Sequence, residues 1–136
     1  MNVSVTRKVR FCAGHRYWRP DWTPEKNREV FGACANENGH GHNYTLEVTV
    51  SGPVDPQTGM VINLGDLDQL IHQLVIDRID HRNLNLDVPE LAGRIPTTEV
   101  LADFIWNILA RPGGLTGRLE EVRVYEADDL WASRRG

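Results

Sequence analysis

The chain has 136 residues, of which 40% are hydrophobic and 25% charged, and its formal net charge at pH 7 is −4. This length and composition are typical of one soluble globular domain, which we expect to span residues 1–136. The net negative charge argues against a broad nucleic-acid-binding surface, because such surfaces carry an excess of lysine and arginine. The sequence has no secretory signal and no apolar run of membrane-spanning length, so we expect a cytoplasmic protein with no nucleic-acid or membrane partner.

The first predicted element is a strand from Asn2 to His15, because apolar residues occupy every second position with the exception of Arg7. Side chains in a strand alternate between its two faces, so these apolar residues share one face. His15 falls at the end of that apolar face. Cys12 falls on the opposite face, where we expect an inert thiol.

A segment rich in tryptophan, proline and charged residues follows, from Trp18 to Glu29, and we expect it to form an ordered surface loop with about one helical turn. The loop leads to Cys34. The chain has only two cysteines, which do not make a disulfide framework. In a cytosolic protein, Cys34 is therefore better interpreted as a metal ligand or a catalytic group.

A second strand is predicted from His40 to Ser51, with apolar residues at every second position from Tyr44 onward. His40 and His42 have the parity of those apolar residues, so both imidazoles lie on the apolar face. A buried polar group without a partner costs about 1–3 kcal/mol. The two rings must therefore be satisfied either by backbone carbonyls or by a metal ion.

If the two strands pair as a long hairpin, the rings of His15, His40 and His42 converge. Three neutral histidines that leave one coordination position open are typical of a catalytic zinc site, whereas structural zinc sites close all four positions, usually with cysteines. Substrate or water would take the open position. His72 lies among solvated residues of a predicted helix, so we expect it at the surface.

Two helices are predicted in the second half of the chain, where apolar residues recur at helical spacing. Turn residues at Asp55–Gly59 and a short predicted strand, Met60–Ile62, precede the first helix, Asp66 to Ile79. The second helix runs from Thr97 or Thr98 to Leu109.

The chain ends with strands predicted from Arg118 to Glu126 and from Leu130 to Arg134. Two long strands, two helices and two further strands indicate an α+β fold. We expect an antiparallel four-stranded sheet with two helices packed on one face.

Three further polar residues deserve a functional interpretation. Glu126 has the parity of two preceding valines, so either the strand ends there and the carboxylate is solvated, or the carboxylate anchors a ligand with a pair of N–H donors. Asp80 and His81 follow the first predicted helix, and both residue types are common at helix ends. A catalytic role for the pair follows only if it faces a nucleophile or base across a site, where the aspartate would orient the imidazole.

The sequence resembles the 6-pyruvoyltetrahydropterin synthase family over nearly its whole length. The similar segments occur in the family's order and are FCAGHRY, FGACANENGHGHNY, DPQTGMVINLGDLDQL, IDHRNLNLDVPE, PTTEVLADFIWN and VRVYEADD. The resemblance implies the T-fold, in which monomers join their sheets into a trimer and two trimers stack into a homohexamer. It also implies active sites that lie between subunits.

The resemblance further implies a role for each matching residue. The zinc ligands would be His15, His40 and His42, and the catalytic group would comprise Cys34, the pair Asp80 and His81, and Glu126. Glu126 would anchor the pterin, beside a loop formed by Thr97, Thr98 and Glu99. Three positions depart from the family pattern, namely Ala35 for a usual asparagine, Glu37 for a usual proline and Cys12 for a usual serine.

The implied activity is the zinc-dependent conversion of 7,8-dihydroneopterin triphosphate to 6-pyruvoyltetrahydropterin, a carbon–oxygen lyase reaction of tetrahydrobiopterin biosynthesis that eliminates triphosphate. Zinc would act as a Lewis acid and Cys34 as the base, and His81 would lower the pKa of the Cys34 thiol. The nearest alternative is 6-carboxy-5,6,7,8-tetrahydropterin synthase of the queuosine pathway, but the five residues between Cys34 and His40 favour the pyruvoyl activity. A non-catalytic pterin- or metal-binding module would need neither a base nor the Asp80–His81 pair.

Overall fold

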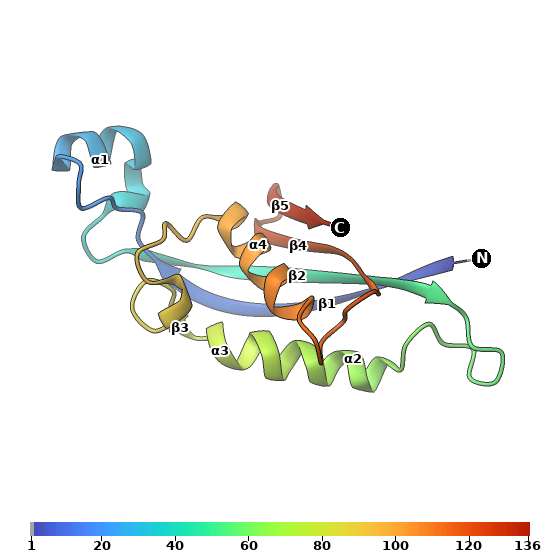
Figure 1. Ribbon diagram of the computed structural model, residues 1–136. Coiled ribbons are helices and arrows are strands. Elements are labelled where there is room, and N and C mark those ends of the chain that lie inside the picture. The colour runs from blue at the N-terminus through green and yellow to red at the C-terminus, as the bar shows by residue number, and fades with distance from the viewer. Residues whose placement is uncertain (1) are drawn as a thin grey trace.

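The computed structural model describes residues 2–136, and a long antiparallel hairpin forms its centre (Figure 1). β1 (Asn2–His15) and β2 (His40–Pro53) pair over their whole length, with His15 opposite His40. β4 (Leu119–Ala127) pairs with β2, and β5 (Leu130–Arg135) pairs with β4, both antiparallel. These four strands and their directions confirm the predicted antiparallel arrangement.

The sheet has a fifth strand that the sequence did not predict. β3 (Arg82–Asn83) runs parallel to β1 on its free side, so the strand order is β3-β1-β2-β4-β5 and the sheet is mixed. The expectation of four strands is therefore wrong by this one short strand. A strand of two residues is too short to produce a detectable apolar alternation.

Two helical segments pack on one face of the sheet, as predicted (Figure 1). The first comprises α2 (Leu64–Ile71), a π-helical segment at His72–Ile76 and α3 (Asp77–Ile79) without interruption. Asn63 caps α2 by accepting hydrogen bonds from the backbone N–H groups of the next turn. The second is α4 (Thr98–Leu109), which packs against β4 and β5. His72 is exposed, as expected.

The segment after β1 forms more helix than expected. Pro24–Phe31 is an eight-residue helix, α1, followed by a 3-10 turn at Gly32–Ala35, and η3 (Pro89–Leu91) is a second 3-10 turn. α1 begins with Thr23, whose side chain accepts from Lys26 N–H, and it is tied to the preceding loop by the buried Asn27. Polar capping and tethering stabilise this helix, so apolar periodicity does not reveal it.

The expected strand at Met60–Ile62 is absent from the described sheet. After the Asp55–Gly59 turn, Met60 is irregular and Val61 and Ile62 form a bend. β2 already has β1 on one side and β4 on the other, so the returning chain finds no free strand edge there. Val61 instead offers its carbonyl to the Arg118 guanidinium at 3.0 Å.

The core lies between the sheet and the helices, and most of its residues were predicted from strand parity and helical spacing. Leu84, Leu91 and Leu115 are buried outside those patterns, and Val3 is 39% exposed. Fully buried members include Leu46, Val48, Val50, Leu67, Ile71, Leu101, Ile105, Val122 and Val124. Each such side chain contributes about 1.5–3 kcal/mol through burial. Among residues 2–136 there is no helix with the length and apolar character needed to cross a membrane.

Candidate metal centre and active site

The hairpin register brings three imidazoles together at one end of the sheet. His15 pairs with His40, and Ala13 pairs with His42, so all three rings emerge from neighbouring positions on the apolar face. Their ring centroids lie 4.9 to 5.0 Å apart. His15 Nε2 is 3.3 Å from His40 Nε2. The rings therefore present nitrogen atoms to a common centre.

His15 is the buried member of this group, and its surroundings keep it neutral. Burial, followed by the charges of His42 and His40, lowers the pKa of His15 from 6.5 to about 4. The Tyr44 hydroxyl lies 3.0 Å from His15 Nδ1. When Nδ1 donates to that hydroxyl, Nε2 carries the lone pair, and this is the nitrogen that faces the centre.

Glu126 points its carboxylate into the same centre. Its Oε1 lies 3.2 Å from His42 Nε2 and 3.8 Å from His15 Nε2, and the side chain is only 13% exposed. The solvated alternative is therefore wrong. Neither Glu126 Oε1 nor His42 Nε2, both buried, makes a hydrogen bond within the described residues. Buried polar atoms without partners are costly, and a cation between them would satisfy both.

Cys34 borders the histidines from the 3-10 turn that follows α1. Its Sγ lies 3.8 Å from His40 Nε2, and its carbonyl accepts a hydrogen bond from Tyr17 N–H. Burial and then the negative charge of Glu126 raise the pKa of the Cys34 thiol. This direction is opposite to the expectation that His81 lowers it, so the surroundings within one chain favour the thiol over the thiolate.

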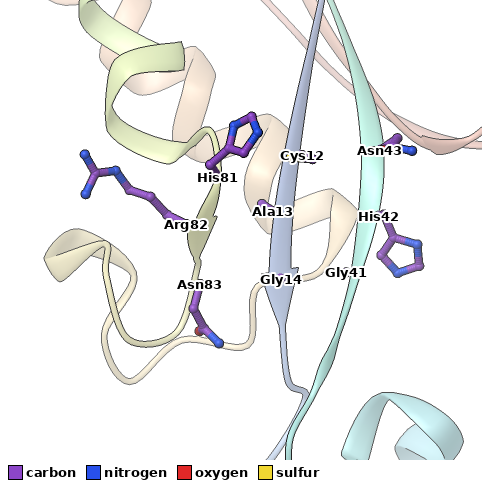
Figure 2. Close-up of a pocket in the computed structure, with 9 residues that line it drawn as sticks. All are labelled: Cys12, Ala13, Gly14, Gly41, His42, Asn43, His81, Arg82 and Asn83. Atoms are coloured by element: carbon purple, nitrogen blue, oxygen red, sulfur yellow. The ribbon is translucent and has the colours of Figure 1, made fainter.

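Asp80 and His81 form a pair, but their contacts are with Cys12. Asp80 Oδ1 lies 2.9 Å from His81 Nδ1 and also accepts a hydrogen bond from Cys12 N–H at 2.9 Å. Burial alone would raise the pKa of Asp80, but the hydrogen bonds from Cys12 and His81 lower it overall. Figure 2 shows His81 beside β1 next to Cys12, whereas His42 projects from the far side of β2. Within residues 2–136, neither member of the pair bonds to Cys34.

The three residues expected to line a pterin pocket lie at the start of α4. The Thr97 hydroxyl accepts from Val100 N–H and caps the helix, and Thr98 is buried. Glu99 is exposed, and its charge contributes to the raised pKa of Tyr17. The start of α4 therefore lies near the histidine end of the sheet, although the Thr97 hydroxyl is engaged in capping.

Two tyrosines belong to the site and were not assigned a role from the sequence. The Tyr17 ring lies 4.7 Å from the His15 ring, and Tyr44 bonds to His15. Burial is the main cause that raises the pKa of both hydroxyls, and the negative charge of Glu126 is the second cause in each case. Each tyrosine lies two residues beyond a site histidine, so a search for polar groups on the extended apolar face would have found them.

Comparison with known proteins gives a consistent picture over the whole chain. A family model described as 6-pyruvoyl tetrahydropterin synthase matches residues 4–136. The human protein named 6-pyruvoyl tetrahydrobiopterin synthase is 44% identical over 129 residues, which cover 93% of this chain and 87% of the human one. The solved structure of Caenorhabditis elegans 6-pyruvoyl tetrahydropterin synthase matches with a TM-score of 0.92 at 34% identity and covers 100% of this chain and 96% of that chain. This superposition confirms the expected fold.

A relative with a different printed activity is more distant. The Aquifex aeolicus protein named 6-carboxy-5,6,7,8-tetrahydropterin synthase is 30% identical over 153 residues, which cover 96% of this chain and 93% of that protein. The human relative is thus more similar to this chain than the Aquifex relative is.

Proposed function

Because the chain belongs to the 6-pyruvoyl tetrahydropterin synthase family, we propose that it converts 7,8-dihydroneopterin triphosphate to 6-pyruvoyltetrahydropterin with elimination of triphosphate. The observation that carries this proposal is the convergence of three imidazoles with Cys34 and a buried carboxylate at one end of the sheet. A base, an anchor and a metal-ligating triad in one place are the parts that a proton-abstracting lyase needs. The enzyme is then a carbon–oxygen lyase.

The residues fit a divalent cation, which we propose to be Zn²⁺. His15, His40 and His42 would hold it, and it would supply Lewis-acid stabilisation of negative charge on a substrate oxygen. Two features support the fit, namely the neutral state of His15 and the unpaired buried Nε2 atom of His42. Tyr44 orients the His15 ring from the opposite side.

Cys34 is the proposed base. Burial raises the pKa of its thiol in the metal-free chain, so a positive charge nearby would favour the thiolate. Within its own chain, the Asp80–His81 pair contacts Cys12 instead. We therefore assign this role to the Asp80–His81 pair of a neighbouring copy in a homohexamer, a dimer of trimers. In that arrangement Asp80 orients the imidazole, and the imidazolium stabilises the thiolate.

Glu126 is the proposed anchor of the pterin. Its carboxylate would accept two charge-assisted hydrogen bonds from the 2-amino and N3 edge, which fixes the side chain of the substrate over the histidines. Thr97, Thr98 and Glu99 would line the pterin pocket. The Thr97 hydroxyl is occupied by Val100 N–H, so we assign this segment a shaping role through its backbone.

The test is to identify the pterin formed from 7,8-dihydroneopterin triphosphate by zinc-loaded protein under anaerobic conditions, using mass spectrometry. We expect the pyruvoyl product and one triphosphate per turnover, and no product from Cys34→Ala. Cys12→Ala serves as the matched control, because it removes the other thiol of the chain. A carboxylated pterin with released acetaldehyde would instead assign the 6-carboxytetrahydropterin synthase activity. Binding without turnover would leave only a pterin- or metal-binding module.

A further inference from the structure

Cys12, Asp80 and His81 form a cluster of metal-ligating side chains that is separate from the three histidines. Each offers one ligand atom, and these atoms lie within 4.8 Å of one another. Cys12 is on the face of β1 opposite to His15, so this cluster and the histidine centre lie on different sides of the hairpin (Figure 2). The proposed reaction gives a role to Asp80 and His81 and none to Cys12.

Backbone contacts fix the position of the cluster. His81 N–H donates to the Cys12 carbonyl at 2.7 Å, and Cys12 N–H donates to Asp80 Oδ1 at 2.9 Å. His81 has a positive φ of 60°, a conformation uncommon in residues other than glycine. These contacts hold the thiol, the carboxylate and the imidazole beside one another even though their chain positions are far apart.

In the single chain, the cluster is open to ions from solution. It borders a surface cavity of about 420 Å³, and the His81 side chain is 79% exposed. Asn43, which faces Cys12 across the β1–β2 pair, also lines the cavity and offers a neutral amide oxygen. Arg82 is a cationic residue of the lining, and Figure 2 shows it projecting away from Cys12.

We propose that Cys12, Asp80 and His81 bind a second divalent, thiophilic cation such as Zn²⁺ or Cd²⁺, and that this binding inhibits the enzyme. Thiolate, carboxylate and imidazole are all ligands of such ions, and the thiol releases its proton to solvent when the ion binds. Ligand distances of about 2.0–2.3 Å require the side chains to close around the ion. The exposed His81 ring has the freedom to do so.

The inhibitory part rests on the proposed function. Asp80 and His81 cannot hold a cation and at the same time stabilise the Cys34 thiolate of a neighbouring copy. The thiol of Cys12 supplies the soft ligand, and a serine hydroxyl at this position would bind such an ion far more weakly.

Binding is tested in Cys34→Ser protein stripped of metal, in which Cys12 is the remaining thiol. Titration with Cd²⁺ should produce the ultraviolet absorbance of a cadmium thiolate, and adding Cys12→Ser should abolish it. His81→Ala removes a proposed ligand. It should weaken Cd²⁺ binding at least ~10–100-fold, which is the loss typical of removing a residue that only orients a metal ligand. His72→Ala should leave Cd²⁺ binding unchanged. If His81→Ala binds Cd²⁺ as tightly as its parent protein does, the ion is bound by the Cys12 thiol alone, and the proposed site is wrong.

Inhibition is tested by adding excess Zn²⁺ to zinc-loaded protein during turnover. We expect Cys12→Ser to retain the basal turnover of the wild type and to need at least about tenfold more Zn²⁺ for half-inhibition. Equal inhibition of both proteins would overturn the regulatory role. If the wild type shows no turnover, the proposed function fails, and the Cd²⁺ titration still decides whether the site exists.

Discussion

His15 illustrates how single residues prepare the metal centre. It is fully buried beside two other imidazoles, and a proton on its ring would be both desolvated and repelled. Tyr44 occupies its other nitrogen. The ring is therefore neutral and oriented before any ion arrives.

The neutral state of His15 predicts how the stability of metal-free protein depends on pH. The pKa of His15 is about 4 in the fold and 6.5 when unperturbed, so the unfolded chain takes up the proton first as pH falls. The contribution of His15 to stability is complete above pH 6.5 and is lost as pH falls toward 4, by up to about 3 kcal/mol. Urea unfolding of EDTA-treated protein between these pH values measures this loss of unfolding free energy.

The control for this prediction is a second histidine. His15→Gln should flatten the pH dependence above the range in which carboxylates titrate, whereas the exposed His72→Gln should keep the wild-type slope. An unchanged slope in His15→Gln would contradict the assignment.

Tyr44→Phe should weaken metal binding while keeping most of the packing. Phenylalanine preserves the stacking on Phe11, whose ring lies 4.8 Å from that of Tyr44, but it removes the hydroxyl that orients His15. We expect metal affinity to fall about 10–100-fold, with a stability loss of about 1 kcal/mol. Chelator competition measures the affinity. Tyr125→Phe, which removes a hydroxyl on another strand, should leave it unchanged, and an equal loss in both variants would contradict the role of Tyr44.

At the scale of secondary-structure elements, the start of β2 must approach the end of β1 very closely. A Cβ at Gly39 would lie 2.5 Å from the His15 carbonyl oxygen, and a Cβ at Gly41 would lie 3.0 Å from the Ala13 carbonyl oxygen. Two glycines around His40 therefore permit the register that brings the histidines together.

Gly39→Ala should consequently disturb both the fold and the metal centre. Gly39 also has a positive φ of 69°, which costs an alanine about 1–2 kcal/mol before any clash. Gly59→Ala is the matched control, because its φ is 74° and nothing lies within 4 Å of the added Cβ. We expect a larger loss of unfolding free energy in Gly39→Ala, together with loss of bound metal. Equal losses in the two variants would show that the close approach is unimportant.

The elements differ in how far the sequence could predict them. Parity in β1 and β2 predicted which histidines share a face, because the side-chain period of a strand is fixed by its geometry. The length of α1 was underestimated because Thr23 and Asn27 stabilise the helix by hydrogen bonds that leave no apolar stripe. The direction of the Cys34 pKa was also missed, since it depends on burial and on Glu126, two features that only the folded arrangement reveals.

At the scale of the whole molecule, one chain holds the parts of the proposed active site in two places. The histidines, Cys34 and Glu126 lie together, whereas Asp80 and His81 lie beside Cys12. β5 is an edge strand of the sheet and carries Trp131, which is 48% exposed. A free edge with an exposed aromatic residue is suited to pairing with another copy, as the proposed hexamer requires.

The most direct test of a shared catalytic centre mixes two inactive variants. Cys34→Ala and His81→Ala are each expected to lack turnover of 7,8-dihydroneopterin triphosphate. When the two are unfolded together and reassembled, a site can combine an intact Cys34 with the intact His81 of another copy. We predict recovery of about a quarter of wild-type turnover for random assembly, with 6-pyruvoyltetrahydropterin as the product. No recovery from reassembled mixtures, when wild-type protein treated in the same way regains its activity, would contradict the account.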